Sequence, residues 1–228
     1  MTKDYIHKEF PKTVGRTEFW KQIKRTVNGK EVSEEEISMI VEKVIKSLSF
    51  SKNDHLLDLG CGNAALSSNF FPLIDSYTGV DFSEYLLDIA REFFKPNDHV
   101  NYIESDVVSF VENSESNIYN KILMYGVMSY LKRDVLLSLL ELFMTKYQNT
   151  EIVFIGNIPN KNMAKEFYSN RNIKDFDVDD HETPIGVWWD PDELKAISLN
   201  IGFQAETSFM PDMFYGSKYR FDLKLTRN

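Results

Sequence analysis

The sequence predicts an α/β protein with a Rossmann-like, doubly wound sheet that is mostly parallel, with an antiparallel hairpin at its C-terminal edge and an N-terminal helical cap. Short apolar segments alternate with amphipathic helical segments between residues 55 and 199, a pattern typical of a parallel sheet with helices on both faces. Two strand-like segments, 203–209 and 218–225, then end the chain without a helix between them, which predicts the hairpin. With 228 residues, 43% of them hydrophobic, the chain is long enough for one domain with a substantial core.

The first predicted element is a helix over residues 33–49. Ser33 and Glu36 form a capping-box pattern, and apolar residues follow at helical spacing. The segments that follow predict, in chain order, strand 55–59, helix 63–71, strand 77–80, helix 83–94, strand 100–103, strand 121–124, helix 132–147, strand 151–155 and helix 191–199.

These elements predict a single domain over residues 1–228. Residues 1–50 would form an N-terminal helical cap or lid, and residues 51–228 the ligand-binding core. The segment 157–190 is long for a plain connection, so we interpret it as a functional insertion in that core.

Composition and charge exclude several classes of protein. The net charge of −9 argues against a broad nucleic-acid-binding surface, although residues 1–30 hold eight Lys or Arg against three Asp or Glu. One cysteine and four scattered histidines predict neither a disulfide framework nor a metal site. The N-terminal residues lack a signal-peptide pattern and no 18-residue apolar run occurs, so we expect a cytoplasmic protein without membrane insertion.

One glycine-rich motif carries most of the chemical information. Gly60 and Gly62 fit the pattern G-x-G-x-x-A at the end of a predicted strand, and Asp81 follows Gly62 by 19 residues. This is a dinucleotide-binding fingerprint, so an NAD-dependent oxidoreductase is one alternative. Asp58 lies two residues before Gly60, where a carboxylate would repel a pyrophosphate but attract the ammonium and sulfonium of S-adenosylmethionine (SAM). Asp106 follows the third strand, where a carboxylate suits the adenine amine.

The segments 58–63, 79–83 and 104–106 together resemble the first three motifs of the class I SAM-dependent methyltransferases, and the resemblance extends over residues 53–225. It implies SAM as the cofactor and S-adenosyl-L-homocysteine as the product. The cofactor-binding residues that it implies, together with the position after the fourth strand, are Asp58, Gly60, Cys61, Gly62, Asp81, Phe82, Asp106, Val107 and Tyr125.

The acceptor is less strongly indicated. The fourth strand ends in Met124-Tyr125-Gly126-Val127, which lacks the motifs of DNA amino- and C5-methyltransferases, so we expect a small-molecule acceptor and transfer to oxygen. The basic, aromatic segment 19–25 suggests that this acceptor is anionic, because arginine binds carboxylates and phosphates bidentately. Residues 19–30 also resemble methyltransferases encoded with bacterial surface-polysaccharide genes, including the group linked to O-methyl phosphoramidate, which implies a role in polysaccharide biosynthesis.

Catalytic and acceptor-binding candidates follow from these segments. His181 in the insertion is a candidate general base, and Tyr125 at the fourth strand's end is a second catalytic candidate. The predicted acceptor contacts are Trp20, Arg25, His181 and Trp189. The fourth strand's end offers no carboxylate for Mg²⁺, which predicts metal-independent activity.

Two further alternatives stay open. The first is a non-catalytic binding subunit with a SAM-binding fold, because the sequence offers every cofactor motif but no certain catalytic residue. The second is a nucleic-acid methyltransferase. Residues 157–160 superficially resemble an RNA adenine methyltransferase motif, but they follow the fifth strand rather than the fourth, so we interpret them as a strand-end turn.

Overall fold

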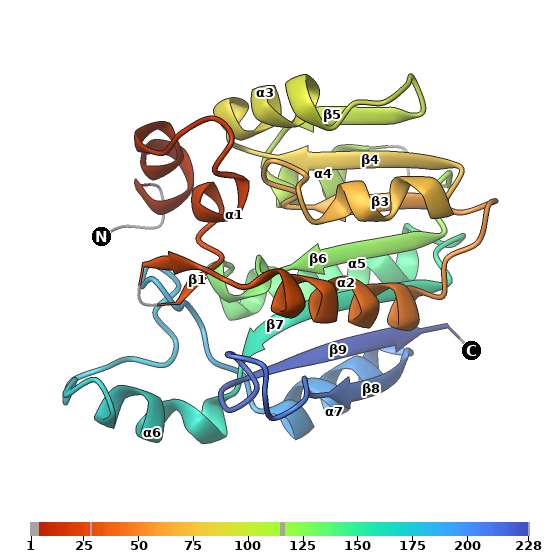
Figure 1. Cartoon of the computed structure of the whole chain (residues 1–228). Helices are drawn as coiled ribbons and strands as arrows, with labels where there is room; N and C mark the ends of the chain where they lie inside the picture. The colour runs from red at the N-terminus through yellow and green to blue at the C-terminus, as the bar shows by residue number, and fades with distance from the viewer. Residues whose placement is uncertain (1–4, 28, 115–116, 228) are drawn as a thin grey trace.

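The centre of the molecule is a seven-stranded sheet with the strand order β5-β4-β3-β6-β7-β9-β8, seen in a computed structural model that describes residues 5–27, 29–114 and 117–227 (Figure 1). The five parallel strands are β3 (His55–Leu59), β4 (Ser76–Asp81), β5 (Val100–Glu104), β6 (Lys121–Tyr125) and β7 (Ile152–Pro159). Strand β9 (Arg220–Thr226) runs antiparallel to β7 and to the edge strand β8 (Gln204–Ser208). The predicted fold class, with its C-terminal hairpin, is confirmed.

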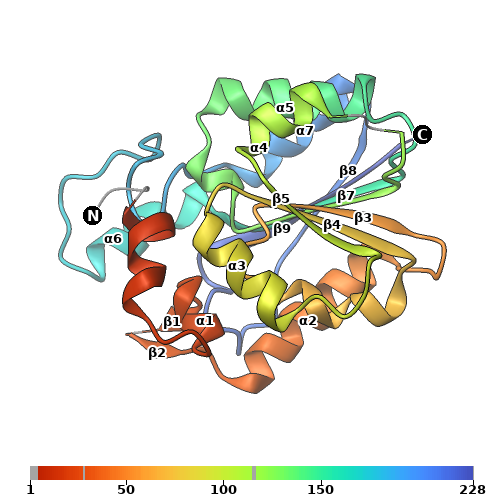
Figure 2. The same ribbon diagram turned by 90° about the horizontal axis from the view of Figure 1, so that it is seen from above.

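Helices cover both faces of this sheet (Figure 2). One face carries α4 (Val107–Asn113), α5 (Arg133–Thr145) and α7 (Pro191–Ile201), which bury the larger hydrophobic cluster against the strands. The other carries α2 (Glu34–Leu48) and α3 (Glu84–Phe93), and α2 packs over a second cluster. Among the described residues no helix is long and apolar enough to cross a bilayer. The cytoplasmic location stays a prediction.

The order of the strands fixes where a ligand can bind. From β3 the chain proceeds to β4 and β5 on one side, and β6 and β7 lie on the other side. The carboxyl ends of β3 and β6 therefore form the topological switch point, where open α/β sheets bind their ligands. Every candidate cofactor residue predicted from the sequence lies at or just after the carboxyl end of β3, β4, β5 or β6.

An N-terminal segment lies beside these strand ends. This segment, which we call the arm, comprises residues 5–27 and 29–31 and contains short helical turns at Tyr5–Glu9, Phe10–Thr13 and Phe19–Gln22 and the hairpin strands β1 (Thr26–Val27) and β2 (Lys30–Glu31). It runs past the arrowheads of β4, β6 and β7 (Figure 1). The ring of Phe19 packs 5.2 Å from Phe93 and 4.9 Å from Phe94, centroid to centroid, and Arg16 pairs with Glu92, so the arm rests on the end of α3.

One predicted helix is wrong. Residues 63–71 form turns, with short 3-10 segments at Ser67–Asn69 and Phe71–Leu73. Ala64 has a φ of +59°, which a right-handed helix cannot contain, and Pro72 lacks the N–H that a continuing helix would use. The short helices α4 and α6 (Ala164–Ser169) were not predicted from the sequence, since segments of six or seven residues give little periodicity.

Strand β7 contains a bulge that shapes the end of the sheet. The pairing with β9 shifts register between Ile155 and Ile158, and Asn157 has a φ of +65°. The Asn157 N–H donates to Asp222 Oδ1 at 2.9 Å, and Arg220 Nη1 donates to the Asn157 carbonyl at 2.9 Å. Bulges often re-aim side chains next to a site, and this one fixes two charged residues of β9. Residues 157–159 thus belong to a strand rather than to a turn.

The capping box of α2 gives a stability prediction. Ser33 Oγ accepts the Glu36 N–H at 3.2 Å, and Glu36 Oε1 accepts the Tyr215 N–H at 3.0 Å, so this helix start also holds the loop before β9. We expect Ser33→Ala to lower the free energy of unfolding in urea by about 1 kcal/mol. Ser38→Ala, on the exposed side of the same helix, is the control and should change it by less than half as much. Equal effects in the two variants would contradict the capping role.

Candidate functional site

The turn after β3 has the geometry that the glycine motif requires. Gly60 and Gly62 have φ values of +77° and +55°, and the N–H groups of Gly60 and Cys61 both donate to the Val80 carbonyl, at 2.7 and 3.0 Å. A Cβ on Gly60 would lie 2.2 Å from Val127 Cγ2, just beyond the end of β6. Only glycine fits this position, because both the backbone angle and the close approach exclude a side chain.

Asp81 ties the turn to the end of β4. Its Oδ2 accepts the Gly62 N–H at 2.8 Å and its Oδ1 accepts the Ser83 N–H at 2.9 Å. Burial raises the pKa of Asp81 to about 6, against the effect of these hydrogen bonds. Each carboxylate oxygen has a further lone pair, so the group can still accept from ribose hydroxyls.

Asp58 lies beneath the same turn. Its Oδ2 accepts from Tyr77 Oη at 2.8 Å and from Ser67 Oγ, and burial raises its pKa to about 6. Within the described part of the chain, no lysine or arginine lies within 4 Å of Asp58 or Asp81. Two desolvated carboxyls without a cation fit a cationic ligand such as SAM and do not fit a pyrophosphate. Burial also raises the pKa of the Cys61 thiol, which keeps it neutral.

The predicted adenine side is covered by the arm. Phe82 follows Asp81 and is half-buried, with the His7 ring 6.3 Å away and Lys8 Nζ 4.9 Å from its centroid. Asp106 is exposed and caps α4, its Oδ1 accepting the N–H groups of the second and third helical residues at 2.9 and 3.1 Å. Val107 begins that helix and is buried in the larger core. The adenine contact of Asp106 stays a prediction.

The arm is fastened to the glycine turn by Asn63. This side chain is fully buried, and its Nδ2 donates to the Phe19 carbonyl and to Gln22 Oε1, both at 2.8 Å. Ile23 reaches the turn itself, since its Cγ2 lies 3.0 Å from the point where a Cβ of Gly62 would be. The glycine turn and the arm therefore form one packed unit.

The other half of the site lies at the end of β6. Tyr125 stacks on Gly156, where a Cβ would meet its ring at 2.3 Å. Arg25 reaches across from the arm, with Cζ 4.7 Å from the Tyr125 centroid and Nη2 3.0 Å from the Cβ position of Gly126. Tyr215 also lies near this guanidinium. Of the predicted acceptor contacts, Arg25 is thus brought directly to the switch point.

The remaining predicted residues lie elsewhere. Trp20 is half-buried and packs against the hydrophobic cluster beneath α2. Trp189 is 1% exposed in the larger core, with Arg133 Cζ 4.1 Å from its ring, so we assign it to packing. His181 lies in the insertion loop, with Nε2 3.0 Å from Glu182 Oε1.

Other residues of this loop contact the segment that follows β6. The Val187 N–H donates to the Ser129 carbonyl at 2.7 Å.

Sequence reasoning did not select Asn63, Asn157 or Arg220. Asn63 directly follows Gly62 of the glycine motif. A polar side chain at this position, in a turn that the fold buries, was the sign in the sequence that could have identified it. Asn157 follows Gly156 near the end of an apolar strand, which is a weak sign of a bulge. Nothing local in the sequence distinguishes Arg220, which depends on the antiparallel pairing of β9 for its position.

Known proteins match the same part of the chain. The protein-family model described as "Methyltransferase domain" matches residues 56–145, from β3 to the end of α5. The match covers less than half of the chain.

Solved methyltransferases have the same fold. Magnesium protoporphyrin IX methyltransferase from Synechocystis PCC 6803, solved with bound S-adenosylhomocysteine, has a TM-score of 0.62 at 13% identity, with 85% of this chain and 83% of that chain covered. The N-methyltransferase NodS from Bradyrhizobium japonicum WM9 has a TM-score of 0.62 at 11% identity, with 86% and 98% covered. The predicted class I methyltransferase fold is confirmed, and the family match over residues 56–145 supports the predicted enzyme class and SAM cofactor.

A curated relative covers only part of this domain. Ribosomal RNA small subunit methyltransferase A from Prosthecochloris aestuarii is 31% identical over 68 residues, which are 30% of this chain and 25% of that protein. The chain thus matches about a quarter of that relative's length, and the match does not identify an acceptor.

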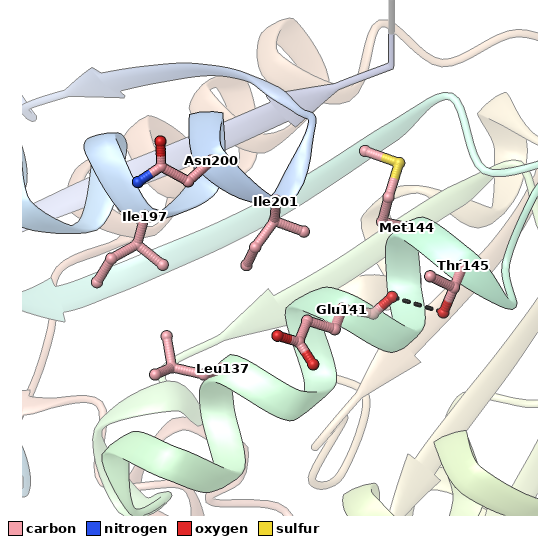
Figure 3. A pocket seen from close by; sticks show the side chains of 7 residues that line it. All are labelled: Leu137, Glu141, Met144, Thr145, Ile197, Asn200 and Ile201. Atoms are coloured by element: carbon pink, nitrogen blue, oxygen red, sulfur yellow. Dashed lines mark hydrogen bonds between the residues drawn. The ribbon is translucent and has the colours of Figure 1, made fainter.

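A surface pocket lies away from this site. It has a volume of about 440 Å³ and is formed between α5 and α7 on the outer side of the sheet (Figure 3). Leu137, Met144, Ile197 and Ile201 give it an apolar lining, and Thr145 Oγ1 donates to the Glu141 carbonyl at its end. None of its lining residues belongs to the strand ends described above.

The position of Asp81 predicts a large effect on cofactor affinity. Asp81→Ala removes the acceptor for the ribose hydroxyls and releases the Gly62 N–H, so we expect SAM to bind about 1.5–3 kcal/mol more weakly, roughly 10- to 150-fold. Isothermal titration calorimetry on the folded variant measures this change. Asp75→Ala, at the opposite end of β4, is the control and should bind SAM normally. Unchanged affinity in Asp81→Ala would refute the ribose assignment.

Asp58 predicts a pH-dependent stability. Its pKa is about 6 in the folded protein and about 4 in an unfolded chain, so its contribution is fully present below pH 4 and is lost as the pH rises through 6. Both of its donors bind Oδ2, so the amide oxygen of Asp58→Asn can replace that atom. Between pH 5 and 7, urea unfolding of ligand-free wild type should lose about 1 kcal/mol more stability than Asp58→Asn. Parallel pH profiles would contradict the shift.

Proposed function

We propose that the chain transfers the methyl group of SAM to an oxygen of a small anionic metabolite, and that Arg25 holds the acceptor's charge. The observation that carries this proposal is the position of Arg25 at the carboxyl end of β6, above Tyr125 and Gly126. Within the described ranges, no carboxylate lies within 4 Å of this guanidinium.

Arg25 differs from three other cations of the arm, which form ion pairs. Lys12, Arg16 and Lys21 pair with Glu9, Glu92 and Glu18 on the exposed surface. Such pairs contribute little to stability, and they leave the arm without a continuous basic surface. Arg25 is half-buried and stays charged, although burial opposes its charge. An anionic ligand would offset that desolvation with charge-assisted hydrogen bonds.

In the proposed reaction, the main task of the protein is to position two reactants. Bound SAM supplies an electrophilic methyl group on a positive sulfonium. The arm orients the acceptor and excludes water, because it covers the strand ends from Phe82 to Gly126. An anionic oxygen needs no general base. Burial raises the pKa of Tyr125 well above its usual range, so its hydroxyl keeps its proton and can donate a hydrogen bond to the acceptor.

The general base predicted at His181 is not required in this scheme. Its partner Glu182 holds it in the insertion loop. If the acceptor has a neutral hydroxyl, we propose His181 as the general base. The whole chain from 1 to 228 would act as one domain, with the arm as its lid.

The acceptor's biological source is proposed from sequence resemblance. Residues 19–30, which include Arg25, resemble methyltransferases encoded with surface-polysaccharide genes. Phosphoramidate and sugar-nucleotide acceptors are therefore the first compounds for an acceptor library.

RNA is the second candidate acceptor. The stretch of 31% identity to a ribosomal RNA methyltransferase favours it. The net charge of −9 and the paired cations of the arm favour the small anion. Ribosomal RNA belongs in the same labelled-SAM assay, and methylation of RNA alone would replace our proposal. Binding of SAM without transfer to any compound would favour a non-catalytic binding subunit.

Arg25 provides the test of the anionic acceptor. We expect Arg25→Ala to lower kcat/KM for the acceptor roughly 10- to 150-fold, mainly through KM, because a charge-assisted hydrogen bond contributes about 1.5–3 kcal/mol. Arg25→Lys should recover part of the loss, since lysine keeps the charge but not the planar fork. Lys12→Ala removes an exposed arm charge and should leave the kinetics unchanged. Wild-type kinetics in both Arg25 variants would reject the role.

A further inference from the structure

Two arginines from distant parts of the chain converge on the end of β6 and β7. We propose that Arg25 and Arg220, together with the Asn157 side chain, form a two-sided binding site for a tetrahedral, doubly charged oxyanion of the phosphate type. This inference rests on the proposed function, in which the acceptor is anionic, and it names the chemical class of the anion.

The distances place two of the three donor groups around one point and tie the third to the adjoining bulge. The Cβ position of Gly126 lies 3.0 Å from Arg25 Nη2 and 3.4 Å from Asn157 Nδ2. Arg220 Nη1 donates to the Asn157 carbonyl at 2.9 Å, which fixes the second guanidinium to the same bulge. Arg25 comes from the arm and Arg220 from the start of β9, so the two approach the bulge from different elements.

The positive charges of both arginines act on the tyrosines next to this point. Burial raises the pKa values of Tyr125 and Tyr130, and the positive charges of Arg25 and Arg220 both oppose that rise. The two guanidinium groups therefore share one partly desolvated environment. Both arginines are half-buried rather than extended into water.

Two arginine charges lie near Tyr125, and Asp222 is the acid that acts on the same tyrosine. In the parts of the chain that the structure describes, no carboxylate lies within 4 Å of Arg25 or Arg220. The nearby acid is Asp222, whose Oδ1 accepts the Asn157 N–H and whose Oδ2 lies 4.0 Å from Lys43 Nζ. Asp222 is thus engaged by the bulge and by α2, which leaves two guanidinium charges without a protein anion.

The arrangement fits a phosphate-type group better than a carboxylate. A carboxylate has one charge and two oxygens in a plane, which one arginine satisfies bidentately. A phosphate-type group carries nearly two charges and three acceptor oxygens, so it can bind two guanidinium groups and an amide from different directions. The bulge supplies the geometry, because the left-handed backbone of Asn157 holds its carbonyl on Arg220 while its side chain faces Gly126.

Inorganic phosphate is the probe. We expect it to bind ligand-free wild type at pH 8 at least 10-fold more tightly than acetate does at equal ionic strength, measured by NMR titration. The backbone amides of Gly126 and Asn157 should shift on addition of phosphate. Because this measurement needs no variant, it remains decisive if a substitution prevents folding. Equal affinity for acetate and phosphate, or shifts confined to other residues, would overturn the proposal.

Variants then separate the two arginines from general charge. Arg25→Ala and Arg220→Ala should each weaken phosphate binding at least 10-fold, and the lysine variants should lie between these and wild type. Arg171→Ala removes an exposed arginine that stacks on Phe167, and it should bind phosphate normally. An unchanged phosphate affinity in Arg220→Ala would reject its role in the site.

A failure of the anion site can be distinguished from a failure of the proposed function. Phosphate binding that needs both arginines, without methyl transfer from labelled SAM to any acceptor, would support the anion site and reject the proposed function. Transfer to a small acceptor whose kcat/KM falls in Arg25→Ala but not in Arg220→Ala would do the reverse.

Discussion

The hydrogen bond from the Gly62 N–H to Asp81 is the interaction on which the rest of the site depends. It joins the turn after β3 to the end of β4, where the Gly60 and Cys61 N–H groups also donate to the Val80 carbonyl. The turn must adopt left-handed backbone angles at Gly60 and Gly62 to present that N–H. Once it does, the side chain of Asn63 emerges where the arm can bind it, so the lid's position follows from the turn's geometry.

The antiparallel strand β9 completes the other half of the site. Parallel strands end together at one edge, and an antiparallel strand begins at that edge. Arg220 and Asp222 lie at the start of β9 and therefore at the carboxyl ends of β6 and β7. At the bulge, these two residues bind different backbone groups of Asn157. Its N–H donates to Asp222, and its carbonyl accepts from Arg220. Without the bulge, the two side chains of β9 would have no backbone group turned toward them.

The sequence was sufficient to predict the strands, and to place the candidate cofactor residues at their ends, because those features are local. Each predicted parallel strand is an apolar run, and Asp58, Gly60 and Asp81 stand within such runs or just after them. The acceptor half depends on contacts between residues far apart in the chain. Arg25 and Asn157 meet at Gly126 only after folding. Trp189, which was predicted to contact the acceptor, is buried in the larger core and packs against Arg133. The helix expected over 63–71 failed because the left-handed Ala64 that the turn imposes overrides helical periodicity.

The two halves of the site have opposite charge requirements, and this bears on the rate of the proposed reaction. Asp58 and Asp81 form an acidic, desolvated half that suits a positive donor, whereas Arg25 and Arg220 form a basic half that suits a negative acceptor. When a sulfonium reacts with an anion, the two opposite charges of the reactants cancel in the transition state. Water stabilises the separated charges more than the partly neutralised transition state, so a site that excludes water favours the reaction. The arm supplies that exclusion, because it covers both halves and is fastened between them by Asn63. In the proposed reaction each half would bind its own reactant by charge, and the arm over both halves would exclude the solvent that otherwise keeps the two ions apart.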